Sequence, residues 1–131
     1  MLELDHGQKL MNDLWEATPF KVDLPDSLRS AYFSVKGPVP LYHDNRRTYH
    51  RYFMRGKAVL KRGDAMIGTF TKDVSRQGVG FFSPVPLLPK EHIKLRVPAA
   101  ELSLEVTRCR RIEPKCFECG AKFALHNQSS H

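Results

Sequence analysis

The sequence predicts an all-β fold: a six-stranded antiparallel β-barrel with an N-terminal helical extension. From about residue 45 onward, β-branched and aromatic runs are separated by turn residues at short intervals, which is typical of β-strands. No helical periodicity interrupts these runs, and this favours an antiparallel barrel or sandwich. The chain has 131 residues, of which 41% are hydrophobic, so it can bury one core and fold as a single domain with short extensions.

Six strands are expected, and each is bounded by glycine, proline or other turn residues. They span residues 52–61, 65–72, 79–82, 92–97, 102–112 and 116–124. A turn at residues 75–78 separates the second strand from the third, and a proline-rich loop at 83–89 follows the third. The connections are short and contain no helix, so we expect consecutive strands to pair as hairpins.

The N-terminal part of the chain has a helical texture. Four apolar residues fall at helical spacing: Leu10, Met11, Leu14 and Trp15. They suit either packing residues or a docking face, and packing inward is the favoured expectation. A second short helix is expected to open at residues 25–27 and to run through Phe33.

Residues 37–40, Gly-Pro-Val-Pro, are expected to break regular structure and to mark a boundary. We therefore divide the chain into a helical extension with its connector at 1–44, the β-barrel domain at 45–124, and a short polar C-terminal tail at 125–131.

The formal net charge of +7 points to an anionic partner such as a nucleic acid, a nucleotide or an acidic membrane surface. The first ten residues lack the basic and apolar runs of a secretory signal, and no stretch is long enough to span a bilayer. Three cysteines near the C-terminal end, an odd number, suit reduced thiols better than a disulfide framework. A cytoplasmic location is therefore expected.

Arginines are concentrated where the connector meets the first barrel strand. Arg46, Arg47 and Arg51 form the pattern RRxxxR, and no acidic residue occurs between Arg46 and Arg62, so a strongly positive local field is expected. Guanidinium groups bind phosphate oxygens bidentately and stack on planar bases, so this cluster is a candidate clamp for a nucleotide phosphate. The same charges also suit the solvated face of an edge strand, and the short pattern alone does not decide between the two.

A second pattern, DxSxxG, follows the second strand at Asp73, Ser75 and Gly78. Asp and Ser hydrogen-bond to nearby backbone in turns, and Gly78 is expected to supply a positive φ, so a structural turn explains the pattern by itself. In a binding site, the Asp73 carboxylate would accept hydrogen bonds from the Watson–Crick edge of a guanine. The Ser75 hydroxyl would hydrogen-bond to a neighbouring atom on the edge of the same base.

Together the two patterns are much more specific than either one. RxxxR from Arg47 to Arg51 is followed, one strand pair later, by DxSxxG from Asp73 to Gly78, and in this combination the sequence resembles the PilZ family. The resemblance covers roughly residues 45–124 and includes a closing strand of similar texture at 117–123. It implies a six-stranded barrel that binds the bacterial second messenger cyclic di-GMP and signals to a partner protein, without enzymatic activity.

The resemblance also implies a role for each motif residue. Arg47 and Arg51 would contact phosphate and stack on guanine. Asp73 and Ser75 would recognise guanine, and Gly78 would let the backbone approach the ligand.

Arg46 stands directly before the motif, at a position where family members with arginine tend to hold an intercalated pair of ligand molecules. Ligand would order the arginine segment and so change how the N-terminal helices meet a downstream protein. One departure from the family is the end of the chain, because many members close with an amphipathic helix and this sequence has a polar tail.

No metal site, cofactor or catalytic group is expected. Cys116 and Cys119 form a CxxC that would need Cys109 and a histidine to complete a zinc site. Positions three apart in a strand point to opposite faces, however, and Cys119 alternates with apolar neighbours, so we expect it to be a core residue. Paired carboxylates, a nucleophile with its base, and a metal triad are not found at usable spacing, so an enzyme is not predicted.

Two other functions are kept as alternatives. Aromatic residues Tyr49, Tyr52 and Phe53 in the basic stripe suit base stacking, so one alternative is a small nucleic-acid-binding barrel. The other is a PilZ-like scaffold that binds proteins and no nucleotide. The intact Asp73, Ser75 and both arginines of the motif favour the cyclic di-GMP receptor over this scaffold.

Overall fold

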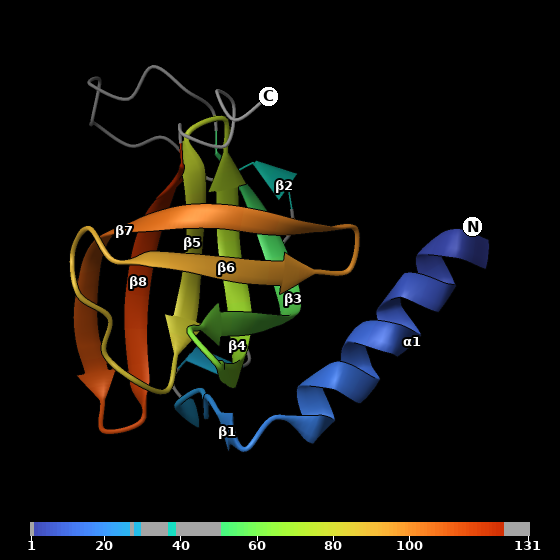
Figure 1. Cartoon of the computed structure of the whole chain (residues 1–131), viewed down its shortest axis with the longest axis horizontal. Helices are drawn as coiled ribbons and strands as arrows, with labels where there is room; N and C mark the ends of the chain where they lie inside the picture. The colour runs from blue at the N-terminus through green and yellow to red at the C-terminus, as the bar shows by residue number, and fades with distance from the viewer. Residues whose placement is uncertain (1, 27, 30–36, 39–50, 125–131) are drawn as a thin grey trace.

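The computed structural model describes residues 2–26, 28–29, 37–38 and 51–124. Within these ranges the chain forms helix α1 (Leu2–Ala17) and eight strands (Figure 1): β1 (Phe20–Lys21), β2 (Gly37–Pro38), β3 (Arg51–Arg62), β4 (Ala65–Ser75), β5 (Gly78–Ser83), β6 (His92–Val97), β7 (Ala100–Glu113) and β8 (Cys116–Phe123). None of the described helices is both long and apolar enough to cross a membrane.

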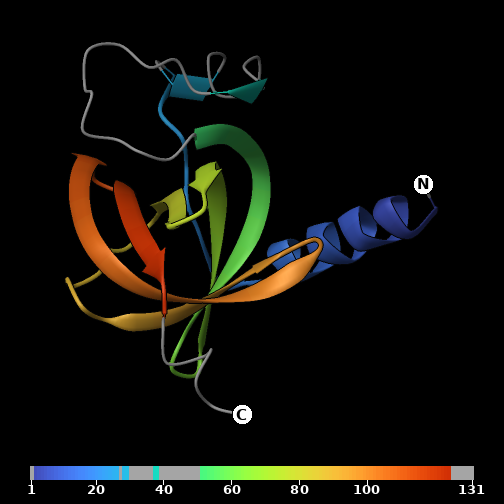
Figure 2. The same ribbon diagram turned by 90° about the horizontal axis from the view of Figure 1, so that it is seen from above.

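Six of the strands close into a barrel. The sheet runs β4-β5-β8-β7-β6-β3, and β3 pairs again with β4, so the antiparallel ladder returns to its start. Seen from above, these strands curve around a common axis, and α1 lies to one side of the barrel (Figure 2). The predicted six-stranded antiparallel barrel with an N-terminal helix is confirmed.

The six predicted strands are all present, but the second hairpin differs from the prediction. β4 continues through Ser75 and β5 begins at Gly78, so only Arg76 and Gln77 connect them. The DxSxxG pattern therefore lies at the predicted turn, but the turn is shorter than expected, and the pattern includes the end of one strand and the start of the next. Cross-strand pairing extends both strands because the ladder from Arg51↔Ser75 to Gly78↔Lys122 supplies backbone partners.

Two short strands in the N-terminal part were not predicted. β1 pairs in parallel with β4, and β2 pairs with β3 through Gly37↔Phe53 and Pro38↔Tyr52. The prediction that Gly37 and Pro38 break regular structure was wrong, because they add an edge strand to β3, and an edge is a position in a sheet that tolerates proline. Both strands attach the N-terminal region to the barrel.

Alternate residues of the barrel strands fill one core. Its buried members come from all six barrel strands and, with Leu87, from the loop after β5. They are Ala58, Leu60, Ile67, Val79, Phe81, Leu87, Ile93, Leu95, Leu104, Val106, Cys119 and Ala121. Phe117 and Phe123 pack against this core from β8. The prediction that Cys119 is a core residue on an apolar face of the closing strand is confirmed.

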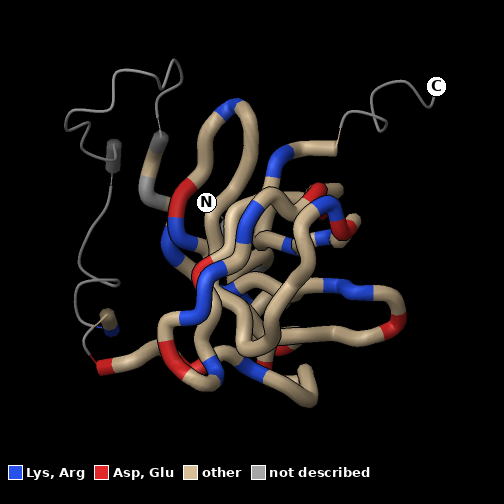
Figure 3. Tube along the Cα trace, turned by 90° about the vertical axis from the view of Figure 1, so that its left-hand side faces the viewer, with Lys and Arg blue, Asp and Glu red and all other residues tan. Residues whose placement is uncertain are grey.

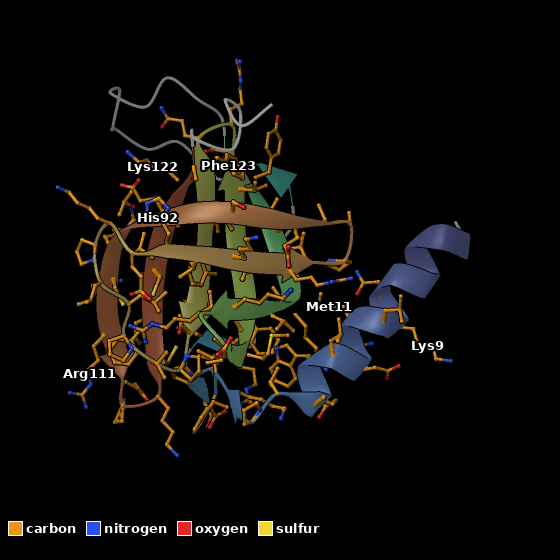
Figure 4. All side chains as sticks on the ribbon, in the orientation of Figure 1. Lys9, Met11, His92, Arg111, Lys122 and Phe123 are labelled. Atoms are coloured by element: carbon orange, nitrogen blue, oxygen red, sulfur yellow. The ribbon has the colours of Figure 1, made fainter. Side chains whose placement is uncertain are left out.

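Helix α1 packs on the outside of β3 and β4. Met11 and Trp15 are buried against Val59, and the Trp15 Nε1 donates a hydrogen bond of 2.8 Å to the Thr69 carbonyl. Met11 faces the barrel while Lys9 points away from it (Figure 4). Leu10 is 47% exposed, so the predicted inward stripe holds for only part of its residues.

A helical turn begins at Pro25, whose carbonyl accepts hydrogen bonds of 2.9 Å from the backbone N–H groups of Leu28 and Arg29. The remainder of the second predicted helix, up to Phe33, lies outside the described residues, as does the C-terminal tail.

Candidate functional site

The two sequence patterns meet where β3 begins and β4 ends. Arg51, the last arginine of RRxxxR, is the cross-strand partner of Ser75 in DxSxxG. Directly opposed residues of an antiparallel pair have Cα atoms about 4.5 to 5.5 Å apart. Arg46, Arg47 and the side chain of Arg51 lie outside the described part of the chain.

Two β-bulges determine which side chains reach the outside of the barrel here. On β4 the register with β5 shifts between Thr71 and Asp73, and on β7 the register with β8 shifts between Val106 and Arg108. Each bulge inserts one residue and so reverses the alternation of the strand. On β4, Ile67 and Val74 both pack in the core although they are an odd number of residues apart, and Asp73 therefore faces outward.

The bulge on β7 has the same effect. Val106 and Cys109 both contact the core, so Arg108 points to the outside of the barrel. The two bulges therefore direct one acidic and one basic side chain to the same outer surface.

A row of four cross-strand partners joins these two side chains: Asp73 on β4, Gly80 on β5, Gly120 on β8 and Arg108 on β7. A Cβ atom on Gly80 would lie 2.7 Å from an Asp73 carboxylate oxygen, and one on Gly120 would lie 3.2 Å from the Arg108 guanidinium. The charged side chains thus lie over the glycines from opposite sides. Asp73 is only 3% exposed.

An open pocket of about 580 Å³ lies over this row. Asp73, Ser75 and Gly78 all line it, so the structure brings the three residues of the second pattern into one site. Basic side chains are provided by Arg108 and Lys122, and by Arg76 of the hairpin. The volume is in the range of sites for small organic ligands.

The pocket lies toward one end of the barrel. In Figure 4 the pocket residues Lys122 and Phe123 lie at the opposite end of the barrel from Arg111, which does not line the pocket.

Ser75 and Gly78 also have structural roles in the hairpin. The Ser75 hydroxyl oxygen accepts a hydrogen bond of 3.1 Å from the Gln77 backbone N–H. The prediction of a positive φ at Gly78 was wrong. Among the described glycines, only Gly63 has a positive φ, of 60°. Gly78 is required for a different reason: a Cβ atom there would lie 2.0 Å from the Ala121 carbonyl oxygen of β8.

An ion-pair network supports the bulge on β4. Lys72, the bulged residue, and Arg110 of β7 both pair with the Glu118 carboxylate on β8. Burial by itself raises the pKa of Glu118, but the hydrogen bonds and charges of Lys72 and Arg110 outweigh burial and hold the pKa below its usual value. The network links β4 to β8 across β5, beside the row that carries Asp73.

The basic stripe predicted from Arg46 to Arg62 is divided in the structure. Lys57 lies 3.5 Å from Glu16, and Lys61 lies 2.8 Å from Glu101. Arg62 donates two hydrogen bonds to the Glu91 carboxylate. Lys and Arg positions are interspersed with Asp and Glu along the described chain (Figure 3). The expectation of a strongly positive field was therefore wrong for the second half of β3, because glutamates distant in sequence pair with its basic side chains.

The CxxC cysteines lie in different environments. Cys116 packs with Val22, Leu24 and Phe82 outside the barrel core, whereas Cys119 lies inside it. Burial, with smaller contributions from nearby carboxylates, raises the pKa of Cys116 to about 11. Among the described residues, no three His, Cys, Asp or Glu side chains form a group that could hold a metal ion.

Sequence reasoning missed Gly80, Gly120 and Arg108. Their contribution depends on strand register and on the two bulges, which place glycines of β5 and β8 side by side between two charged residues. The sequence signal is a glycine in the interior of each strand, a position that often marks close approach of a ligand or another chain segment.

A closed barrel with an open pocket of this volume on its outer surface is suited to hold a small ligand. The family model of the PilZ domain matches residues 45–131, and the chain belongs to this family. PilZ domains are generally binding or adaptor domains that catalyse no reaction.

Among solved structures, the chain is similar to the Bacillus subtilis inhibitor of motility, MotI/DgrA, with 16% sequence identity and a TM-score of 0.49. The match covers 73% of this chain and 59% of that one, so the chain spans about three fifths of the length of this neighbour. Comparison with curated proteins gave no significant match.

Proposed function

We propose that this chain is a cytoplasmic, non-enzymatic receptor for cyclic di-GMP that passes the signal to a partner protein. The observation that carries the proposal is the pairing of Arg51 with Ser75, which joins the end of RRxxxR to the pocket that contains Asp73. A phosphate-binding segment and a guanine-binding carboxylate then border one site.

Ligand recognition is divided between the pocket and the arginine segment. The Asp73 carboxylate accepts hydrogen bonds from the N–H donors of a guanine, and the Ser75 hydroxyl binds beside it. Gly80 leaves room for the planar base because it has no side chain, whereas the missing Cβ of Gly78 lets β5 lie close to β8 where Gly78 lines the pocket. Arg46, Arg47 and Arg51 bind the two phosphates and stack on a base, since guanidinium groups do both.

Helix α1 is the element through which the signal leaves the site. β3 runs from Arg51 to the helix contact, where the Lys57 ammonium lies 4.8 Å from the centre of the Trp15 ring and pairs with Glu16. Ligand that fixes the first residues of β3 changes the position of this contact and so the surface that α1 presents. Hydrogen exchange of α1 amides with and without cyclic di-GMP tests this step, and unchanged exchange in saturated protein would exclude it.

A nucleic-acid-binding barrel fits the structure less well than a nucleotide receptor. A backbone-tracking site requires a continuous basic groove, whereas Lys57, Lys61 and Arg62 pair with glutamates. A nucleic-acid binder would also lose affinity steeply with salt and would not prefer a cyclic dinucleotide.

Isothermal titration with cyclic di-GMP tests the proposal on the wild type and on Arg51→Ala and Asp73→Asn. We expect roughly micromolar or tighter affinity, near −8 kcal/mol, and a loss of about 10- to 100-fold in each variant, since a hydrogen bond to a charged group contributes about 1.5 to 3 kcal/mol. Arg111→Ala and Asp64→Asn are matched controls, because both residues are exposed and do not line the pocket. Absence of binding by folded wild type, or equal losses in the controls, would refute the proposal.

The same titration tests the proposed intercalated ligand pair. We expect two molecules of cyclic di-GMP per chain in the wild type and one in Arg46→Ala. A single ligand in both proteins would remove the role proposed for Arg46 and leave the receptor itself intact.

A further inference from the structure

Cys109 of β7 and Cys119 of β8 are directly opposed cross-strand partners. Both cysteines are free, and their sulfur atoms lie 3.2 Å apart. A disulfide needs Cα atoms about 4.4 to 6.8 Å apart and sulfurs at about 2.05 Å. Opposed residues of an antiparallel pair already satisfy the first condition, so a closing movement of about 1 Å by the two side chains is enough to satisfy the second.

The two thiols differ in exposure and in hydrogen bonding. Cys119 is fully buried, whereas Cys109 is only partly buried. Burial raises the pKa of the Cys119 thiol, and its hydrogen bond to Cys109 raises it further. The Cys109 sulfur accepts that bond and another of 3.4 Å from the Leu87 backbone N–H. Of the two residues, Cys109 is therefore the more accessible to a small oxidant, and the Cys119 thiol lies directly beside it.

We propose that Cys109 and Cys119 are an oxidation site that forms a reversible intrachain disulfide when the protein meets a hydroperoxide. With hydrogen peroxide, the Cys109 sulfur attacks the O–O bond, takes one oxygen as a sulfenic acid, and one molecule of water leaves. The Cys119 sulfur then attacks the Cys109 sulfur, the S–S bond forms, and the hydroxyl leaves as a second molecule of water. Two thiols lose two electrons in total, and the peroxide is reduced to water.

The site lies directly behind one wall of the pocket. Arg108 and Gly120, which line the pocket, are the chain neighbours of Cys109 and Cys119, and the cysteines face the core. The disulfide therefore ties β7 to β8 from the inside of the barrel and leaves the outer surface unblocked. Formation of the bond does not depend on whether the pocket binds cyclic di-GMP.

Cys116→Ala leaves Cys109 and Cys119 as the only thiols of the chain and gives the clearest test. The variant is treated with hydrogen peroxide, remaining thiols are alkylated, and the protein is digested with trypsin. We expect peptide 109–110 to be linked to peptide 116–122, both thiols to be protected from alkylation, and a thiol reductant to reverse both effects. We also expect a higher Tm for the oxidised protein than for the reduced one, because the bond restricts the unfolded chain.

Cys109→Ser and Cys119→Ser are the matched controls, and neither should give a linked peptide. If Cys116→Ala does not fold, fragmentation of the linked peptide from wild-type protein shows whether residue 116 or 119 carries the bond. Free thiols after treatment, oxidation of Cys109 beyond the sulfenic acid without a link, or links only between chains would overturn the proposal. All of these outcomes are read without ligand, so they are independent of the titration with cyclic di-GMP.

Discussion

Arg51 and Ser75 are directly opposed across β3 and β4. Arg51 is the last residue of RRxxxR, and Ser75 is the last residue of β4 before the turn to β5. This pairing brings the end of the first pattern beside the second, although a strand hairpin separates them in sequence. The hairpin returns the chain to the level at which it began, so the start of β3 and the pocket residues of β4 and β5 share one end of the barrel. The predictions below separate the contribution of each residue to the fold from its contribution to binding.

Gly78 is predicted to be essential for folding even without ligand. In Gly78→Ala the new Cβ would lie 2.0 Å from the Ala121 carbonyl oxygen, so β5 and β8 must move apart. We expect a loss of about 2 kcal/mol or more in the free energy of unfolding, measured by denaturant titration. Gly56→Ala is the control, since no atom lies within 4 Å of its added Cβ, and it should change stability by less than about 1 kcal/mol. Equal effects in both variants would contradict the packing role of Gly78.

Ser75 is predicted to affect binding more than stability. Ser75→Ala removes the acceptor of the Gln77 N–H bond, which is exposed to water, so the free energy of unfolding should fall by only about 0.5 to 1 kcal/mol. Affinity for cyclic di-GMP should fall about tenfold or more. Denaturant titration measures the free energy of unfolding of this variant, and calorimetry measures its affinity for the ligand. A large loss of stability with unchanged affinity would show that Ser75 acts only in the hairpin.

Arg108 is predicted to strengthen binding of the anionic ligand. Its guanidinium lies over Gly120 in the pocket, and the side chain is exposed, so Arg108→Ala should leave the fold intact and weaken binding by about 10-fold or more. Arg111→Ala, on the same strand, removes the same charge away from the pocket. If the two variants lose affinity equally, Arg108 acts through net charge alone and not through contact with the ligand.

Glu118 is predicted to make the free energy of unfolding fall at acidic pH. Its pKa in the folded protein lies below the usual 4.5, because Lys72 and Arg110 outweigh the effect of burial. The stabilisation is therefore complete above pH 4.5 and is lost as pH falls through the lower, folded-state pKa. Glu118→Gln should cost about 1 to 3 kcal/mol at neutral pH, and its deficit relative to wild type should shrink below pH 4.5. Thermal unfolding across pH measures this, and a constant deficit would argue against the ion pairs.

The barrel could be predicted from the sequence because strand periodicity and turn residues are local signals. The six barrel strands, the core position of Cys119 and the inward Trp15 all follow from patterns of a few neighbouring residues. β1 and β2 could not be predicted in this way. Each has only two residues, and their pairing partners lie on β4 and β3, far along the chain.

The candidate site was only partly predictable for the same reason. Asp73, Ser75 and Gly78 form a short pattern that the sequence displays, and the structure places them in one pocket. Arg108 and Gly120 join them through strand register and two bulges, which depend on contacts between distant segments. The sequence also did not show why residue 78 must be glycine. The requirement comes from the close approach of the β8 backbone and not from the conformation of the turn. Arg46 and Arg47 lie outside the described residues, so their roles stay predictions.

Nuclear magnetic resonance of the amide groups during titration with cyclic di-GMP tests the central claim most directly. The account predicts that the largest shift changes fall on the pocket strands, at residues 73–80, 107–108 and 120–123, and at the start of β3. Lys61, Gly63 and residues 92–94, which line a second hollow together with residues of β7, should change little. Shift changes centred on that second hollow, or none at saturating ligand, would contradict the account.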